Sequence, residues 1–357
     1  MGRVGLLPLS IIVAPLAYEE NPNYSDGMKE KLNIDTDRLT LRQLRGLLAL
    51  EEAGTVTQAA ASLGLTPPAV SMQMGQLEEI VGMPVTERTP SGFQLTDAGR
   101  ELADTARRIE MNLRDCGESL SVLLGTEGGR VVVGGVSTAK YFLPRAVAAF
   151  AEAWQGVSVQ LRIGNRDEVV AALRSYEIDL AVTGRPPLDF AIRRSVVGDH
   201  PYLVIASPDH PLAACGDRVA LERLTTETLL MREKGSGTRT LAMQLFSDAG
   251  LDAPPGMEMG TNESIKQGVM AGLGIAVISS HTVAAEVMAG RLAVLRVDGL
   301  PIIKDWFVAR RRERRLLPAA QAFWDFMSTR GGDFLPEVPG LDPGRRAPSP
   351  EWSEGPV

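Results

Sequence analysis

The sequence predicts an α/β protein in which a winged helix-turn-helix and a long coiled-coil helix precede the α/β domain. Three patterns predict this fold. Residues 54–81 form two short helical patterns joined by a Gly-containing turn, and residues 98–125 hold an unbroken heptad pattern. From residue 130 onward, short β runs alternate with helical segments. At 357 residues the chain has room for two domains with a sizeable core.

The composition fits a cytoplasmic globular protein. Its only two cysteines, Cys116 and Cys215, do not suggest a disulfide framework and fit a reducing cytosol. The net charge of −7 argues against a nucleic-acid binder, but residues 38–100 carry five Arg and no Lys against six Asp and Glu, which gives only −1. A near-neutral module can still bind DNA, because a dimer needs few phosphate contacts.

Residues 1–38 form an N-terminal extension that we expect to be disordered or to precede the true start. The apolar run at 4–17 resembles the core of a signal peptide, but it is too short to span a bilayer and two prolines interrupt it. Met28 begins a more polar stretch that is typical of a protein start. We therefore expect translation to begin near Met28; a working signal peptide would instead indicate secretion.

Residues 39–97 are expected to form the winged helix-turn-helix. A helix over 41–53 comes first, and Gly64 ends the second helical pattern. Thr66 is a suitable N-cap for the third, with Pro67 at the first helical position, where a missing N–H is tolerated. The apolar residues of this third helix recur at spacings of 4, 3 and 4 and predict one buried stripe: Val70, Met74, Leu77 and Val81.

The opposite face of the third helix has no apolar partner, as expected of a helix that enters a DNA groove. That face carries Ser71, Met72, Gly75 and Gln76. These helices alone fit an ordinary helical hairpin equally well. The next segment favours the DNA-binding interpretation, because two extended pieces flank a turn at 90–92 in the pattern of a β-hairpin wing.

Residues 98–125 predict a dimerising linker helix, with Thr96 as its N-cap. Its apolar positions alternate at spacings of 4 and 3: Leu102, Ala106, Ile109, Leu113, Cys116, Leu120 and Leu123. A helix that packs only on its own domain would show a broader stripe, so the narrow seam favours a coiled coil between two chains. We therefore expect a dimer.

Residues 126–330 predict the α/β domain. The series from VVVGGV to DLAVTG alternates strand, helix, strand, helix and strand, and therefore predicts a parallel sheet with right-handed crossovers. The segment 331–357 is rich in Gly and Pro and has few apolar residues, so we expect a disordered tail.

Four β runs of this domain end in a small polar loop at which a helix begins. These loops lie at 137–138, 164–165, 235–238 and 261–262. Four arginines lie in or beside them: Arg166, Arg185, Arg232 and Arg239. Any single loop fits a simple helix cap. Because helix N-termini at strand ends converge on one crevice and favour anions, the four together predict a cleft for a small anionic, hydroxyl-bearing molecule.

No catalytic site is predicted. The segment 137–140, STAK, matches a serine-acylase pattern, but its S-D-N and K-T-G partners are absent. The Gly-Leu-Gly at 272–274 lacks a third glycine and lies between a helix and a strand, which is the wrong order for a dinucleotide site. The three histidines show no metal-ligand spacing. We therefore expect no enzyme activity, cofactor or metal.

About residues 39–328 resemble the LysR-type transcriptional regulators. The N-terminal likeness rests on LRQLRGLLALEEAGTVTQAAASLGLTPPAVSMQMGQLEE and LTDAGREL. A likeness to the regulators of Calvin-cycle and RuBisCO operons rests on VSTAKYFLPR, GNRDEVVAAL, EIDLAVTGRPP, REKGSGTR and NESIKQGVMAGLGIAVISSHTV. The resemblance implies a winged helix-turn-helix, a dimerising linker helix and a two-lobed effector domain like the type 2 periplasmic binding proteins. It also implies a homodimer or homotetramer on an inverted-repeat operator.

The resemblance implies the site residues as well. DNA contacts are carried over to Thr66, Pro67, Pro68, Ser71, Met72, Gln73, Arg88 and Ser91. Effector contacts are carried over to Ser137, Thr138, Asn165, Arg185, Ser236, Thr238, Arg239 and Asn262. The chain departs from the family with Pro67 where Gln is common, Met72 where Lys or Arg is common, and Ser91 where Arg often stands. We therefore expect a weak DNA reader that depends on avidity across the oligomer.

The resulting hypothesis is a transcriptional regulator of carbon-fixation genes. It would bind a double-stranded DNA operator, respond to a small anionic metabolite such as a sugar phosphate, and act on RNA polymerase recruitment without a membrane partner. The effector would shift the lobe arrangement and so the bend imposed on DNA. The alternatives are a LysR-type regulator of another metabolic operon and a periplasmic-type solute-binding protein without DNA binding. An enzyme on a doubly wound sheet lacks any acid–base or nucleophile set.

Overall fold

The computed structural model describes residues 35–90, 92–123, 128–214, 218–254, 256–338, 341 and 345–346. The chain forms two compact units, one up to Arg100 and one from Glu101. Within the described residues, no helix is both long and apolar enough to cross a membrane.

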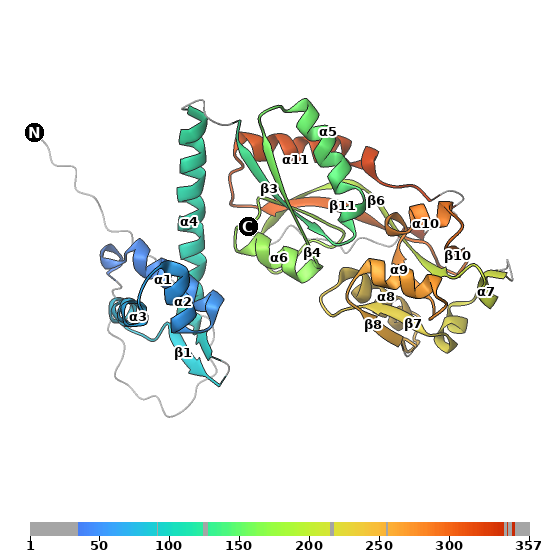
Figure 1. Ribbon diagram of the computed structural model, residues 1–357, viewed down its shortest axis with the longest axis horizontal. Helices are drawn as coiled ribbons and strands as arrows, with labels where there is room; N and C mark the ends of the chain where they lie inside the picture. Colours follow the sequence, from blue (N-terminus) through green and yellow to red (C-terminus); the bar gives the residue numbers. More distant parts are fainter. Residues whose placement is uncertain are drawn as a thin grey trace, which may run out of the picture. The chain divides into compact units, whose positions relative to one another are not determined.

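The first unit is the winged helix-turn-helix that the sequence predicts, with α1, α2 and α3 gathered beside the wing strand β1 (Figure 1). Its elements are η1 (Thr36–Arg38), α1 (Leu41–Ala53), α2 (Val56–Leu63), α3 (Pro67–Val81), β1 (Thr86–Thr89) and β2 (Gly92–Leu95). Thr40 begins α1 with a capping box to Gln43, and glycines in the left-handed region end α1 and α2, Gly54 at φ 68° and Gly64 at φ 65°. The predicted apolar stripe of α3 is buried.

The wing is fastened to the turn between α1 and α2. β1 and β2 pair antiparallel, and the Phe93 N–H donates a hydrogen bond of 2.8 Å to the Gly54 carbonyl. Gly92 has φ 124°, and a Cβ there would lie 2.6 Å from that same carbonyl oxygen. Only glycine therefore fits this crossing.

The linker helix α4 (Asp97–Leu123) begins as expected, because the Thr96 hydroxyl accepts the Gly99 N–H at 3.2 Å. Ala106 of the predicted seam is fully buried, whereas Leu113 and Leu120 are 44% and 54% exposed in the single chain. Cys116, between them, is also exposed. A coiled coil between two chains would cover this part of the seam, and it remains a prediction.

The second unit contains two lobes with separate hydrophobic cores. Lobe 1 comprises β3 (Arg130–Val136), η2 (Ala139–Tyr141), α5 (Leu143–Ala153), β4 (Ser158–Gly164), α6 (Arg166–Arg174), β5 (Leu180–Thr183), α11 (Pro318–Arg330) and η5 (Gly331–Phe334). Lobe 2 comprises α7 (Pro211–Ala214), η3 (Leu221–Thr226), β7 (Leu229–Arg232), α8 (Gly237–Asp248), β8 (Gly256–Met259), α9 (Asn262–Met270), β9 (Ala276–Ser279), η4 (Ser280–Thr282), α10 (Ala284–Met288) and β10 (Ala293–Leu295).

Two long strands, β6 (Ile192–Ala206) and β11 (Ile302–Arg311), join the lobes. Val197 of β6 lies in the lobe 1 core, whereas Val204 of the same strand lies in a lobe 2 core. The predicted parallel pairing is confirmed for β4, β3 and β5, but β6 and β11 pair antiparallel, so the sheet is mixed. In Figure 1, α5 and α11 lie on one side of the lobe 1 strands and α6 lies on the other.

Our prediction of a disordered tail over 331–357 places its start too early. Gly331–Phe334 form a 3-10 helix, and Phe334 and Leu335 pack against the lobe 1 core. Arg345–Arg346 form β12, which pairs with β11. Phe334 and Leu335 bury enough apolar surface to hold this short segment on the lobe 1 core. The high Gly and Pro content of the whole tail concealed this pair in the sequence. The rest of the tail, and residues 1–34 of the predicted extension, lie outside the described residues.

Candidate effector cleft and DNA-binding face

The start of α3 exposes most of the residues that we predict to contact DNA. Thr66, Pro67, Pro68, Ser71 and Met72 are all exposed, and Met72 is 62% exposed. The Thr66 side chain makes no capping hydrogen bond, so its hydroxyl is available to a partner. This face has the small polar residues that a groove-reading helix needs, with an apolar Met72 in the middle.

The other predicted DNA contacts are placed less uniformly. The Gln73 side-chain oxygen is buried and has no hydrogen-bond partner among the residues that the structure describes, and a Cβ on Gly46 of α1 would lie 2.9 Å from it. Gln73 therefore points its oxygen into the bundle rather than outward. Arg88 is exposed on β1, with its guanidinium carbon 5.3 Å from the centroid of the Phe93 ring. Ser91 lies outside the described residues.

Arg232 joins the two lobes at the centre of the predicted cleft. It ends β7 and is only 2% exposed. One terminal nitrogen donates to the Ser137 hydroxyl of lobe 1 at 3.0 Å and to Asn262 Oδ1 of lobe 2 at 2.6 Å. The other edge of the guanidinium forms a two-bond pair with Glu233, with both distances 2.6 Å. Two predicted effector residues, Ser137 and Asn262, are thus brought together.

Asn262 leaves a donor unused at this point. It begins α9 and is 1% exposed, and its Nδ2 is buried with no hydrogen-bond partner among the described residues. The orientation of the amide follows from its surroundings, because Oδ1 accepts from Arg232 and must therefore be the oxygen. A buried N–H without an acceptor is unfavourable, so this amide is suited to a ligand oxygen.

The N-terminus of α8 begins without a side-chain cap. Ser236 and Thr238 are buried here, and Ser236 makes no side-chain cap hydrogen bond. The neighbouring helices differ, because Asn165 caps α6 and Thr261 caps α9 through their side chains. The free N–H groups of the first turn of α8 therefore favour an anion. The Thr238 hydroxyl also forms a hydrogen bond with Tyr202. Burial raises the pKa of Tyr202, and this bond partly lowers it.

Three predicted effector residues are engaged elsewhere or lack a described partner. The Asn165 side chain is used in a capping box with Glu168. Arg239 donates to the Arg232 carbonyl at 2.7 Å and to Glu258 at 2.6 Å, so it braces the Arg232 backbone. Thr138 is buried directly after Ser137, and no cap bond is formed by its side chain.

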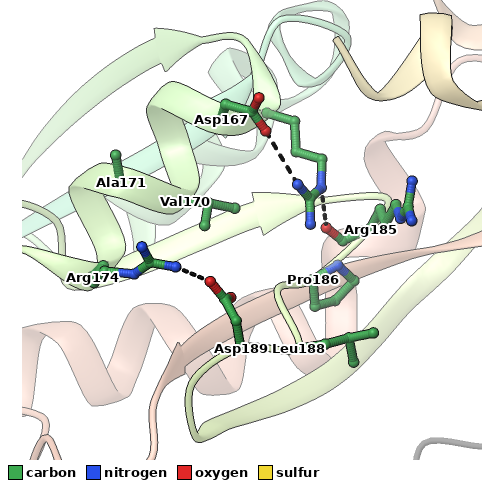
Figure 2. Close-up of a pocket in the computed structure, with 9 residues that line it drawn as sticks. Asp167, Val170, Ala171, Arg174, Arg185, Pro186, Leu188 and Asp189 are labelled. Atoms are coloured by element: carbon green, nitrogen blue, oxygen red, sulfur yellow. Dashed lines mark hydrogen bonds and ion pairs between the residues drawn. The ribbon is translucent and has the colours of Figure 1, made fainter. Parts of the chain in front are cut away.

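Arg185 lies in a pocket of about 390 Å³ on lobe 1, between α6 and the segment that follows β5 (Figure 2). Arg166 donates to the Arg185 carbonyl at 3.0 Å and to Asp167 at 3.2 Å, and Arg174 pairs with Asp189. Figure 2 shows the Arg185 guanidinium extending from the rim, with no interaction drawn to it. Burial lowers the pKa of Arg166, and the like charge of Arg185 lowers it further. The pocket lining therefore holds three arginines against the two carboxylates of Asp167 and Asp189.

Sequence reasoning noted Arg232 beside a loop but did not place it among the effector contacts. It also missed a buried aromatic cluster in which the His200 ring stacks on Trp306 with centroids 3.9 Å apart and His200 Nε2 lies 3.0 Å from the Ser279 hydroxyl. Burial, with His281 nearby, holds the pKa of His200 well below 6.5, so the ring is neutral. These residues lie inside strand patterns, where nothing in the sequence separates them from ordinary core. Within the described part of the chain, no cluster of three metal-binding side chains occurs.

Comparison with known proteins identifies the family. A family model described as the LysR substrate binding domain matches residues 124–331, and one described as the bacterial regulatory helix-turn-helix protein, lysR family, matches residues 41–100. The chain belongs to the LysR-type transcriptional regulators. The LysR family comprises regulators rather than enzymes, as predicted, and the helix-turn-helix match excludes a solute-binding protein without DNA binding.

Relatives within the LysR family share most of the chain. The HTH-type transcriptional regulator CbbR of Xanthobacter flavus is 47% identical over 86% of this chain and 92% of its own length. The RuBisCO operon transcriptional regulator of Allochromatium vinosum is 41% identical over 81% of this chain and 95% of its own length.

Solved structures agree with the fold. The Synechocystis PCC6803 CcmR regulatory domain in complex with 2-PG is 35% identical, with a TM-score of 0.54, over 56% of this chain and 96% of that one. The LysR family regulator CbnR is 22% identical, with a TM-score of 0.56, over 81% of this chain and 98% of that one. At 22% identity, the similarity to CbnR supports the fold alone.

Proposed function

We propose that this LysR-type regulator controls carbon-fixation genes, and that a small anionic metabolite in the cleft between its lobes modulates its binding to operator DNA. The relatives named above support the target genes, because they are RuBisCO operon and CbbR regulators. The CcmR regulatory domain, which binds 2-PG, supports a small ligand in the effector domain. A sugar phosphate is a further candidate of the same chemical class.

The observation that carries the ligand class is the unpaired Asn262 donor beside the buried Arg232 guanidinium. An oxyanion placed there would accept from Asn262 Nδ2 and lie close to Arg232, and the free N–H groups of α8 offer further donors. Because Glu233 already balances the charge of Arg232, neutral donors supply much of the recognition. This arrangement suits a compact phosphorylated or carboxylated metabolite.

The ligand would act by population shift. Its donors lie on lobe 2, but Arg232 also bonds Ser137 of lobe 1, so a ligand seated beside this contact would stabilise the arrangement in which the lobes meet. The change would reach DNA through the oligomer, altering the bend of the operator and the recruitment of RNA polymerase. A homodimer joined along the uncovered part of α4, assembled further into a homotetramer in the cytoplasm, fits this action. A mass of two or more chains by light scattering would support that assembly.

Titration of the full chain with 2-PG and with sugar phosphates by calorimetry tests the cleft. Asn262→Ala removes the unpaired donor and should weaken binding at least about tenfold, as expected for a hydrogen bond to a charged group. Asn112→Ala, which removes an exposed amide from α4, serves as the matched control and should bind like the wild type. Equal affinity in both variants, or no binding of any of these anions to the wild type, would overturn the cleft assignment.

A gel shift with promoter DNA tests the proposed DNA-binding face. Ser71→Glu places a carboxylate on the exposed face of α3 and should weaken operator binding strongly through repulsion from phosphates. Ser247→Glu adds the same charge to an exposed position of α8 and should have little effect. An unchanged affinity of the Ser71 variant would show that α3 does not read this DNA.

A further inference from the structure

A hydrogen bond crosses between the lobes beside the effector cleft. Tyr141 of lobe 1 donates its hydroxyl to Oε1 of Glu263 in lobe 2 at 2.5 Å. Tyr141 ends η2, the turn that directly follows Ser137 and Thr138, and Glu263 directly follows Asn262 on α9. The contact therefore ties together the two backbone segments that carry the cleft donors.

Charged neighbours hold the Glu263 carboxylate in this position. Its Oε1 lies 3.0 Å from the Lys266 ammonium and 3.8 Å from that of Lys140. Lys266 is 3% exposed, sits 4.9 Å from the centroid of the Tyr141 ring, and also donates to Glu286 at 2.9 Å. The carboxylate is thus surrounded by donors from both lobes, which is the arrangement that makes charge-assisted hydrogen bonds strong.

The protonation states keep this hydrogen bond available near neutral pH. Burial raises the pKa of Tyr141 above its ordinary value, and the bond to Glu263 raises it further. Burial opposes ionisation of Glu263, but the bonds from Tyr141 and Lys266 outweigh it and leave the pKa of this carboxyl below its ordinary value. The phenol stays a donor and the carboxylate stays an acceptor.

We infer that Tyr141 and Glu263 form a clasp that holds the lobes together and positions Ser137 and Asn262 for the effector. This inference rests on the proposed effector cleft and adds the residues that set its resting arrangement. Breaking the clasp lowers the fraction of molecules whose lobes are closed, and the apparent affinity for an effector falls by that fraction. Tyr141 is a positioning residue in this account, because it acts through Glu263 and the lobe arrangement.

The chain offers a matched control for this clasp. Tyr176 donates to Glu313 at 2.9 Å, and both residues belong to lobe 1. Tyr141→Phe and Tyr176→Phe therefore each remove one phenol–carboxylate hydrogen bond, but only the first bond crosses between lobes. A general loss of stability would affect both variants, whereas the clasp predicts an effect on lobe closure in the first alone.

Two measurements on the full chain test the clasp. Hydrogen exchange of the peptide 261–270 without any ligand should quicken at least about fivefold in Tyr141→Phe and stay unchanged in Tyr176→Phe. Calorimetric titration with 2-PG should show about tenfold weaker binding to Tyr141→Phe and unchanged binding to Tyr176→Phe. The double variant Tyr141→Phe/Glu263→Gln should bind 2-PG no more weakly than the weaker of its two single variants.

The outcomes separate the clasp from the proposed cleft. Equal exchange in Tyr141→Phe and wild type would overturn the clasp, whatever 2-PG does. Faster exchange in Tyr141→Phe with no 2-PG binding to the wild type would leave the clasp standing and overturn 2-PG as the ligand. Independent effects of the two substitutions, which add in the double variant, would also contradict a direct Tyr141–Glu263 contact.

Discussion

Replacing Gly99 by alanine tests how the linker helix is packed on the winged helix-turn-helix. Gly99 lies in the first turn of α4, and a Cβ there would lie 1.9 Å from the Val85 carbonyl oxygen and 3.3 Å from the Leu95 Cβ. Either the helix or the entry to the wing must move by more than an ångström. Overpacking of this kind destabilises by about 1–3 kcal/mol or more. Alanine in a helix recovers about 1 kcal/mol relative to glycine, so the net destabilisation is about 0–2 kcal/mol, or more where the clash exceeds this range.

Gly117 of the same helix provides the control. A Cβ at Gly117 would meet no atom within 4 Å, so Gly117→Ala has the same gain in helix propensity without the clash and should stabilise by up to about 1 kcal/mol. The two substitutions therefore have opposite signs and differ by about 1–3 kcal/mol, which is the cost of the contact alone. For a unit of this size, each kcal/mol moves the midpoint by about 4–8 °C.

Calorimetric unfolding of the full chain measures the difference. Because the two units can unfold separately, the transition of the first unit is identified by its upward shift on adding promoter DNA. Gly99→Ala should lower this midpoint and weaken promoter binding. Gly117→Ala lies in the second unit, so it should leave this transition and DNA binding unchanged and raise the midpoint of the second unit instead. If both variants unfold and bind DNA like the wild type, the close approach of α4 to Val85 is wrong.

Two further substitutions address the DNA face and the joint between α4 and lobe 1. Met72→Lys restores a cation to the exposed face of α3, so promoter binding should tighten and its dependence on log salt should steepen by about one unit; a weaker complex would mean that Met72 contacts a base. At the joint, the buried Arg314 pairs with Asp115 of α4 and Asp179 of lobe 1, and Asp179 also accepts the Val132 N–H at 2.6 Å. Asp179→Asn should therefore destabilise the second unit by about 1–3 kcal/mol, far more than Asp115→Asn in the same thermal assay. Burial raises the pKa of Asp115 despite the opposing effect of Arg314, so the stability that this group contributes is full below its unfolded pKa and is lost as the pH rises through its folded pKa. Thermal scans from pH 4 to 8 should show a larger loss in the wild type than in Asp115→Asn, which keeps the contribution of Glu118, whose pKa burial also raises; equal pH profiles would refute it.

The order of elements could be predicted because local signals agree with the fold. Gly54 and Gly64 end their helices in left-handed conformations, and the 4-3-4 stripe of α3 is buried as its spacing requires. The antiparallel pairing of β6 with β11 was missed because the paired residues are about a hundred positions apart in the sequence. Strand patterns show which residues face a core but do not identify the partner strand.

The site was predicted in part for a similar reason. Ser137 and Asn262 could be named from the sequence because each follows a strand at a polar loop, which is a local pattern; their contact with an effector stays a prediction. The roles of Arg232 and Tyr141 depend on contacts between lobes, at 3.0 Å to Ser137 and 2.5 Å to Glu263. Such contacts leave no periodic trace in the sequence. Arg239 also lies beside a loop, but nothing in the sequence indicates its bonds to the Arg232 carbonyl and to Glu258.

The central claim is that an anion held by Asn262 and Arg232 changes how this regulator holds DNA. Fluorescence energy transfer between the ends of a labelled promoter fragment, measured with the full chain and increasing 2-PG, tests it most directly. We expect a saturable change in end-to-end distance for the wild type. In Asn262→Ala this change should require an at least about tenfold higher concentration of 2-PG, and in Asn112→Ala it should occur at the wild-type concentration. The same response in Asn262→Ala and wild type would contradict it.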